Sequence, residues 1–188
     1  MIRKVAMRFS TRLLISGVLS VGVVLAGCSS PETGSEHVGS DDHVRIDPLD
    51  PTQLGAEDTA TTAMGAILSW QPAVDESKSD ALRRARPWLG GDLAVAVDQA
   101  TGPAPTLRPD QEWLAWRESG AAVSASCTRA DSTPAAPEGM RTVVIDVTCT
   151  QTVLHAAGSS TPRAPETWRT TATRTDDGWR LTGFRYQQ

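Results

Sequence analysis

The sequence predicts one α+β domain over residues 56–188, in which helices pack on one face of an antiparallel sheet. The first half of this region places apolar residues at helical spacing, whereas the second half alternates apolar with polar residues, as half-buried strands do. Because the helical segments all precede the strands, we expect consecutive strands to pair as an antiparallel meander.

The first helix is predicted downstream of residue 56, where apolar side chains share one helical face. Asp58 or Thr59 is suited to cap its start, since their side-chain oxygens can accept from free backbone N–H groups. Pro72 cannot continue a helix and ends this one shortly after Trp70. The apolar face consists of Ala60, Ala63, Met64, Ile67 and Leu68.

Two further helices are predicted before the first long proline-containing segment. The second helix begins near Asp75 or Ser79, and Pro87 ends or bends it. The Gly90-Gly91 pair breaks the chain, and Asp92 can cap a third short helix after the break.

A last helical turn is predicted over residues 110–117, after a crossing that contains three prolines. Trp113 and Trp116 lie three positions apart in this turn. This spacing places both indole rings on one face of the helix.

The strands are predicted from three segments and one turn. Residues 121–128 and 142–154 alternate apolar with polar residues, and residues 168–175 are rich in β-prone threonine. The sequence Asp176-Asp177-Gly178 is a strong hairpin signal, because Asp and Gly tolerate the positive φ that tight turns need. The apolar residues of the last strand change parity, so a β-bulge is expected at Gly183.

The N-terminus carries the features of a secretory signal peptide. Four basic residues and no acid occupy the first dozen positions, and a mostly apolar run from Leu13 to Ala26 follows. A run of about fourteen residues spans roughly 21 Å as a helix, which is short for a bilayer core of about 30 Å. We therefore expect residues 1–27 to direct export and then to be removed.

The end of this apolar run resembles the lipobox of bacterial lipoproteins, in the sequence Leu25-Ala26-Gly27-Cys28. In that family the cysteine sulfur receives diacylglycerol, and a dedicated peptidase cuts before the cysteine. The resemblance implies a lipoprotein that is acylated at Cys28, with diacylglycerol and palmitate as its lipids. It would be anchored at the extracytoplasmic face of the cell membrane. The alternative is an uncleaved anchor helix with an incidental cysteine.

Residues 28–55 are predicted to form a flexible acidic tether, because they are rich in Ser, Gly, Pro, Asp and Glu and show no helical or strand period. His37 and His43 flank two aspartates there, which could suggest a metal site. A solvated linker is the favoured interpretation, since disordered ligands must be ordered before they bind. No metal site is predicted.

The charge balance is acidic. Loss of residues 1–27 removes four basic residues and no acid, which lowers the formal net charge from −4 to −8. Nucleic-acid binding requires clustered Lys and Arg on the surface, so this balance argues against it. It also argues against adhesion of the protein body to anionic lipid.

Several motifs together resemble the nuclear transport factor 2-like (cystatin-like) superfamily, in particular the envelope domains of actinobacterial Mce-associated proteins and conjugation scaffolds. The resemblance covers the whole domain and implies a curved sheet that wraps a helix to form a cone. Members of the superfamily catalyse, bind ligands or serve as assembly modules, so the fold does not select a function. The residues that carry it are Trp70, Trp113, Trp116, Trp168, Asp176, Asp177, Gly178, Trp179, Leu181 and Phe184.

Cys127 and Cys149 remain as a natural pair once Cys28 is lipidated, because an exported protein meets oxidising conditions. Geometry raises a difficulty, however. In an ordinary hairpin Cys127 would face roughly residue 142, which leaves Cys149 about 23 Å further along the strand. Either the disulfide forms in a different register, or two buried thiols remain.

Six tryptophans could form a ligand platform or fill the core. Core packing is the favoured interpretation, with Trp70, Trp88 and Trp116 as candidate lining residues of a cone mouth. Asp146, His155 and the single tyrosine are the candidates for acid–base chemistry. Nothing in the sequence places those three together, so no catalytic site and no cofactor are predicted.

These observations favour a non-enzymatic interaction or assembly module of an envelope complex, with a protein partner docked on an exposed strand edge. A carrier of a small apolar ligand or lipid is the main alternative, and it requires a deep apolar pocket in the cone. A cone-site enzyme is the least favoured alternative, because it requires Asp146, His155 or another acid inside that pocket.

Overall fold

The structure is a computed structural model that describes residues 50–100, 110–134 and 139–188. The predicted signal peptide, the lipobox with Cys28 and most of the predicted tether lie outside the described residues. In the part of the chain that is described, no helix has the length and apolar character needed to cross a membrane.

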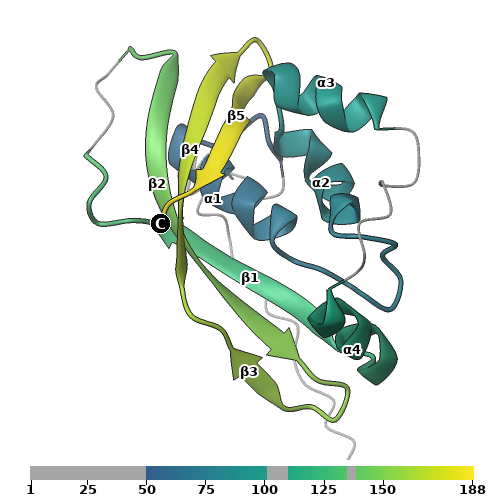
Figure 1. The fold of residues 1–188 in the computed structure, drawn as a ribbon. Helices are drawn as coiled ribbons and strands as arrows, with labels where there is room; N and C mark the ends of the chain where they lie inside the picture. Colours follow the sequence, from purple (N-terminus) through teal and green to yellow (C-terminus); the bar gives the residue numbers. More distant parts are fainter. Residues whose placement is uncertain (1–49, 101–109, 135–138) are drawn as a thin grey trace, which may run out of the picture. The chain divides into compact units, whose positions relative to one another are not determined.

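Helices precede strands along the chain, and the strands form one antiparallel sheet (Figure 1), which confirms the predicted α+β class. The helices are α1 (Ala56–Ile67), α2 (Ser79–Ala85), the short 3-10 helix η1 (Arg86–Trp88), α3 (Gly91–Gln99) and α4 (Gln111–Ser119). The strands are β1 (Ala122–Arg129), β2 (Thr142–Leu154), β3 (Ser160–Pro162), β4 (Glu166–Thr175) and β5 (Gly178–Tyr186).

The starts of two helices differ from the prediction. Helix α1 begins after Gly55, so Asp58 and Thr59 lie in its first turn and not at its cap. The Asp58 carboxylate in the first turn interacts favourably with the positive end of the helix dipole, whereas Thr59 is fully buried against the core. Likewise Gly90 caps α3 and Asp92 lies inside it. In both cases a glycine in extended conformation turns the chain without a side-chain cap.

The long strand β2 organises the sheet, whose order is β1-β2-β4-β5 with β3 paired to the end of β2. Strand β1 pairs with residues 147–154 of β2, whereas β4 pairs with residues 142–149 on its other side. The two neighbours therefore flank different halves of β2 and overlap only in the middle.

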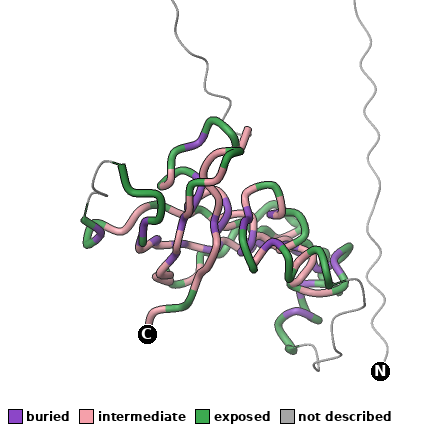
Figure 2. Tube along the Cα trace, turned by 90° about the horizontal axis from the view of Figure 1, so that it is seen from above, coloured by how far each residue is buried: buried purple, intermediate pink, exposed green. Residues whose placement is uncertain are grey.

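The core lies between α1 and the inner face of this sheet. Buried and less buried residues alternate along β2. Figure 2 colours the described chain by burial. Ala60 and Ala63 have no exposed surface, and such small side chains let the helix axis lie close to the strands. The main buried cluster includes Ala60, Ala63, Met64, Ile67, Leu89, Val143, Ile145, Val147, Cys149, Ala172 and Leu181.

The β4–β5 hairpin has the predicted turn and the predicted bulge. Gly178 adopts φ of 106°, which an L side chain rarely adopts. Thr171 pairs with Gly183 but Ala172 pairs with Leu181, so one extra residue of β5 is left between them. The bulge explains how Leu181 and Phe184 can both pack on the main core despite their different parity.

Residues 50–55, which the sequence analysis assigned to the tether, pack against this hairpin. The Arg180 guanidinium donates to the carbonyl oxygen of Pro51 at 3.0 Å. A Cβ on Gly178 would come within 3.1 Å of the Thr52 carbonyl oxygen, and Leu54 is buried. The folded domain therefore includes these six residues, because burial of Leu54 adds to its core.

Cys127 and Cys149 form a disulfide between β1 and β2, with Cα atoms 4.1 Å apart. The two residues lie directly opposite each other in the register. An ordinary hairpin register is absent because Arg129 pairs with Val147, which leaves residues 142–146 of β2 beyond the end of β1. The disulfide expected from an oxidising compartment therefore forms, because the strands do not adopt the register of an ordinary hairpin.

We predict that the double substitution Cys127→Ala, Cys149→Ala lowers the free energy of unfolding by about 3 kcal/mol. The disulfide closes a loop of 22 residues, and its loss returns that much chain entropy to the unfolded state. Urea titration of the oxidised full-length protein measures the difference. A loss below about 1 kcal/mol would contradict the prediction, and reductant should weaken only the wild-type protein.

Candidate docking edge of the sheet

The outer edge of β1 is closed by the backbone that follows α1. Trp70 and Val123 exchange two backbone hydrogen bonds at 2.8 and 2.9 Å. The next outward N–H along the strand, that of Ala125, donates to Ser69 Oγ at 2.9 Å. The Ala121 N–H donates to the Trp116 carbonyl oxygen, also at 2.9 Å. This half of the edge therefore has no free donor to offer another strand.

The opposite edge, that of β5, is closed only in its first half. Leu89 forms an isolated parallel bridge with Leu181, and the Gly90 N–H donates to the Leu181 carbonyl oxygen at 2.9 Å. Beyond this point no described strand pairs with the outer side of β5. We call the segment from Thr182 to Tyr186 the open edge.

The pairing with β4 determines which backbone groups of the open edge face outward. The Gln187 N–H donates to the Thr167 carbonyl oxygen, so the hydrogen-bonded positions of β5 are the odd-numbered ones in this segment. The N–H and C=O groups of Phe184 and Tyr186 therefore point away from β4. They form the unpaired row that an added strand can bind.

Aromatic side chains gather on the inner face beside the open edge. The Trp168 ring centroid lies 6.0 Å from that of Phe184 and 5.4 Å from that of Tyr186, in edge-to-face arrangements. Phe184 is half-buried, whereas Tyr186 is 51% exposed. The edge thus presents an aromatic surface that is only partly covered by the domain itself.

Charged side chains occupy the outer face beside the same edge. Arg169 binds Asp146 with two hydrogen bonds, at 2.9 and 3.1 Å, and Gln187 binds the same carboxylate at 2.6 Å. The hydrogen bond from Arg169 lowers the pKa of Asp146 below its ordinary value. Arg185, which is exposed, lies directly opposite Arg169 in the register.

The three tryptophans predicted to line a cone mouth do not meet in one place. Trp70 packs on Trp116, with ring centroids 6.2 Å apart, and on Trp113 at 6.3 Å. Trp88 and Trp70 both pack against the main core, but among the described residues no ring contact joins Trp88 to Trp70 or Trp116. Trp70 lines a hollow of about 210 Å³ beside β1. Trp113 and Trp116 both contact Trp70, which agrees with the prediction that they share one face of α4.

Two cations cover this tryptophan cluster and tie α4 to the domain. Lys78 lies 4.5 Å from the Trp70 ring centroid, and the Arg163 guanidinium lies 5.4 Å from that of Trp116. Each cation also pairs with an acid at the start of α4. Sequence reasoning missed these contacts, because they join residues that are distant in the chain.

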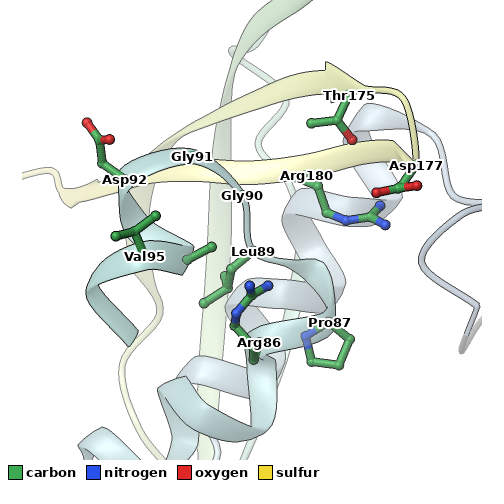
Figure 3. Close-up of a pocket in the computed structure, with 11 residues that line it drawn as sticks. Arg86, Pro87, Leu89, Gly90, Gly91, Asp92, Val95, Thr175, Asp177 and Arg180 are labelled. Carbon is green, nitrogen blue, oxygen red and sulfur yellow. The ribbon is translucent and has the colours of Figure 1, made fainter. Parts of the chain in front are cut away.

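A larger cavity, of about 550 Å³, lies between the start of α3 and the β4–β5 hairpin (Figure 3). Charged side chains line it, including Arg86, Asp92 and Arg180. The Arg86 guanidinium is engaged by Asp98 at 2.7 Å. This cavity is open and lined by charged side chains, whereas a carrier of an apolar ligand requires a deep apolar pocket.

The structure does not bring Asp146, His155 and Tyr186 together. Asp146 faces the outer side of the sheet, whereas Tyr186 faces the inner side with Trp168. His155 follows the end of β2, roughly 30 Å along the strand direction from Asp146, where its ring bonds Thr161. Among the described residues no group of three or more His, Cys, Asp or Glu is placed to hold a metal ion.

No protein-family model matches the sequence, and no curated protein matches it. Three solved structures resemble the fold weakly. A periplasmic fragment of TraM has a TM-score of 0.43 and 10% sequence identity, and the match covers 69% of this chain and 93% of that one. VirB8 of Agrobacterium tumefaciens has a TM-score of 0.39 and 10% identity, with 69% of this chain and 87% of that one covered. The intermembrane space region of the chloroplast protein ARC6 has a TM-score of 0.32 and 13% identity, with 71% of this chain and 96% of that one covered. The assignment of the fold class rests on the element order and strand pairing described above.

We predict that Asp146→Asn lowers the urea midpoint at pH 7, because the opposed pair Arg169 and Arg185 then loses its carboxylate. The pKa of Asp146 is lowered in the folded state, so its contribution is complete above its ordinary value of 3.8 and is lost as pH falls through the lowered pKa. Urea titrations of both proteins from pH 7 downward measure this. A difference that persists unchanged at the most acidic pH would contradict it.

Proposed function

We propose that this chain is an exported lipoprotein, anchored through Cys28, whose domain serves as a non-catalytic docking module in an envelope complex. In this proposal the lipid holds the chain at the extracytoplasmic membrane surface. The domain then binds an extended segment of an envelope protein along the open edge. The partner segment becomes one more strand of the sheet.

The observation that carries the docking role is the aromatic surface beside the open edge, where Tyr186 is 51% exposed. The domain closes the first half of the β1 edge with Trp70 and Ser69, and it closes the start of β5 with Leu89. Unpaired edges invite aggregation, and proteins normally block them. An open edge beside an exposed tyrosine and a partly covered aromatic surface supports a partner that pairs there.

The two alternative functions lack comparable support. A carrier would hold its apolar ligand between α1 and the sheet, where side chains of Met64, Val147 and Leu181 are packed with no exposed surface. An enzyme would need converging acid–base groups, and Asp146, its strongest candidate, is bound by an arginine on the outer face.

The docking role predicts selective cross-linking from one face of the sheet. A benzophenone-bearing phenylalanine in place of Tyr186 is expected to form an adduct with an envelope protein in the native host's membranes. The matched control carries the same residue in place of Val144, which is similarly exposed (56%) but lies on the outer face of β2. Equal adducts from both positions, or none from Tyr186, would contradict the proposal.

The anchoring role predicts that Cys28→Ala blocks processing. Without the thiol there is no acceptor for diacylglycerol, so the chain is expected to keep residues 1–27 and to take up no radiolabelled palmitate. Intact mass and labelling in the native host measure both effects. Cys127→Ala is the control, because it removes a cysteine from the folded domain and should leave labelling unchanged. Normal labelling of the Cys28 variant would overturn this part of the proposal.

A further inference from the structure

We propose that the open edge recognises an extended segment with an apolar–acidic–apolar triplet, the acidic residue lying opposite Arg185. This inference rests on the proposed docking function and specifies the chemistry of the partner. A side chain on an added strand extends the cross-strand row that it joins, so the rows that lead to the edge indicate which partner residues fit there.

Three neighbouring rows cross the sheet from β2 through β4 to β5. In two of these rows the side chains face the core, and in the row between them they face the outer side. The rows are Ile145, Thr170 and Phe184; Asp146, Arg169 and Arg185; and Val147, Trp168 and Tyr186.

The middle row is electrostatically incomplete at its outer end. Two arginines lie directly opposite each other, an arrangement that is unfavourable between neighbouring strands. The only carboxylate of the row, Asp146, has hydrogen bonds from Arg169 and Gln187. Among the described residues no carboxylate lies within 4.0 Å of the Arg185 guanidinium; Arg185 is exposed and interacts with Asp146 only at longer range, without a hydrogen bond. An acidic residue on the added strand would continue the row with the opposite charge.

The flanking rows favour apolar residues. Both end in aromatic side chains, of Phe184 and Tyr186, on the same face as Trp168. Because successive residues of a strand alternate between faces, the partner residues on either side of the acid point toward these rings. They would cover the exposed part of Tyr186 and remove apolar surface from water.

The length of the site is limited by the bridge at Leu181. Leu89 occupies the edge there, so an incoming strand can pair only along the open edge from Thr182 to Tyr186, roughly 16 Å. Such a strand has about five residues. The triplet has the same pattern in both directions, so it fits whether the segment runs parallel or antiparallel to β5.

A second copy of this chain is disfavoured as the occupant. A two-fold antiparallel pairing of two open edges centred on Arg185 would place the two Arg185 guanidinium groups opposite each other. The same arginine that selects an acidic partner therefore opposes self-pairing in this register. In other registers of two open edges no acidic residue faces Arg185, because residues 182–187 contain none.

The test is a selection of random eight-residue peptides, displayed on phage, against the full-length protein in detergent micelles. Arg185→Glu and the control Arg174→Glu, which changes an exposed arginine near the hairpin turn, are selected in parallel. We expect wild type and the control to enrich apolar–acidic–apolar peptides, and Arg185→Glu to enrich apolar–basic–apolar peptides. A synthetic peptide centred on Val-Glu-Val should bind wild type about three- to tenfold more tightly than Arg185→Glu.

The outcomes separate this inference from the docking proposal. Apolar alternating peptides with no preference at the centre, or the same preference in Arg185→Glu, would overturn the inference and leave docking intact. Tyr186→Pro removes an outward N–H without removing a hydrogen bond to β4. Peptides that bind this variant as tightly as wild type are not on the edge, and that result would overturn the docking proposal.

Discussion

The packing of α1 on the inner face of β2 holds the domain together, because each element buries its apolar face against the other. Ala60 and Ala63 bring the helix close to the sheet, while Met64 and Val147 fill the space between them without exposed surface. The helix end is bound as well, since the buried Gln151 amide donates to the Leu68 carbonyl oxygen at 2.7 Å. The position of the helix end and the register of the strands are thus set together.

This arrangement decides the state of both sheet edges. Because α1 ends beside β1, the residues that follow it, Ser69 and Trp70, are in place to bind the β1 edge. The chain then passes through α2 and η1 and reaches β5 only at Leu89. Residues 69–90 thus close one segment of the β1 edge and one of the β5 edge, and they form no backbone pairing with the second half of β5.

Much of the fold could be predicted from the sequence, because the signals are local. Alternation identified β2 with its observed bounds, and the change of parity in the last strand identified the bulge before Phe184. Helix caps were less predictable, since Gly55 and Gly90 cap through backbone conformation and leave no side-chain signal. The three-residue β3 has too few positions to show a period.

Docking of a partner on an exposed strand edge was predicted, but which strand carries that edge could not be derived from the sequence. The opposition of Arg169 and Arg185 depends on the register, which the bulge shifts by one residue. The disulfide shows the same limit, because the pairing of Cys127 with Cys149 required β1 and β2 to be offset in a way that no local pattern reveals. The separation of Trp88 from Trp70 likewise follows from the chain path and not from residue type.

The most direct test of the account is hydrogen exchange at single amides of β5, in the isolated full-length protein and in its complex in native membranes. The account predicts fast exchange of the Phe184 and Tyr186 amides and slow exchange of the Arg185 amide in the isolated protein, because only the last is bound to β4. In the complex all three should exchange slowly. Slow exchange at Phe184 and Tyr186 in the isolated protein, or no change on assembly, would contradict it.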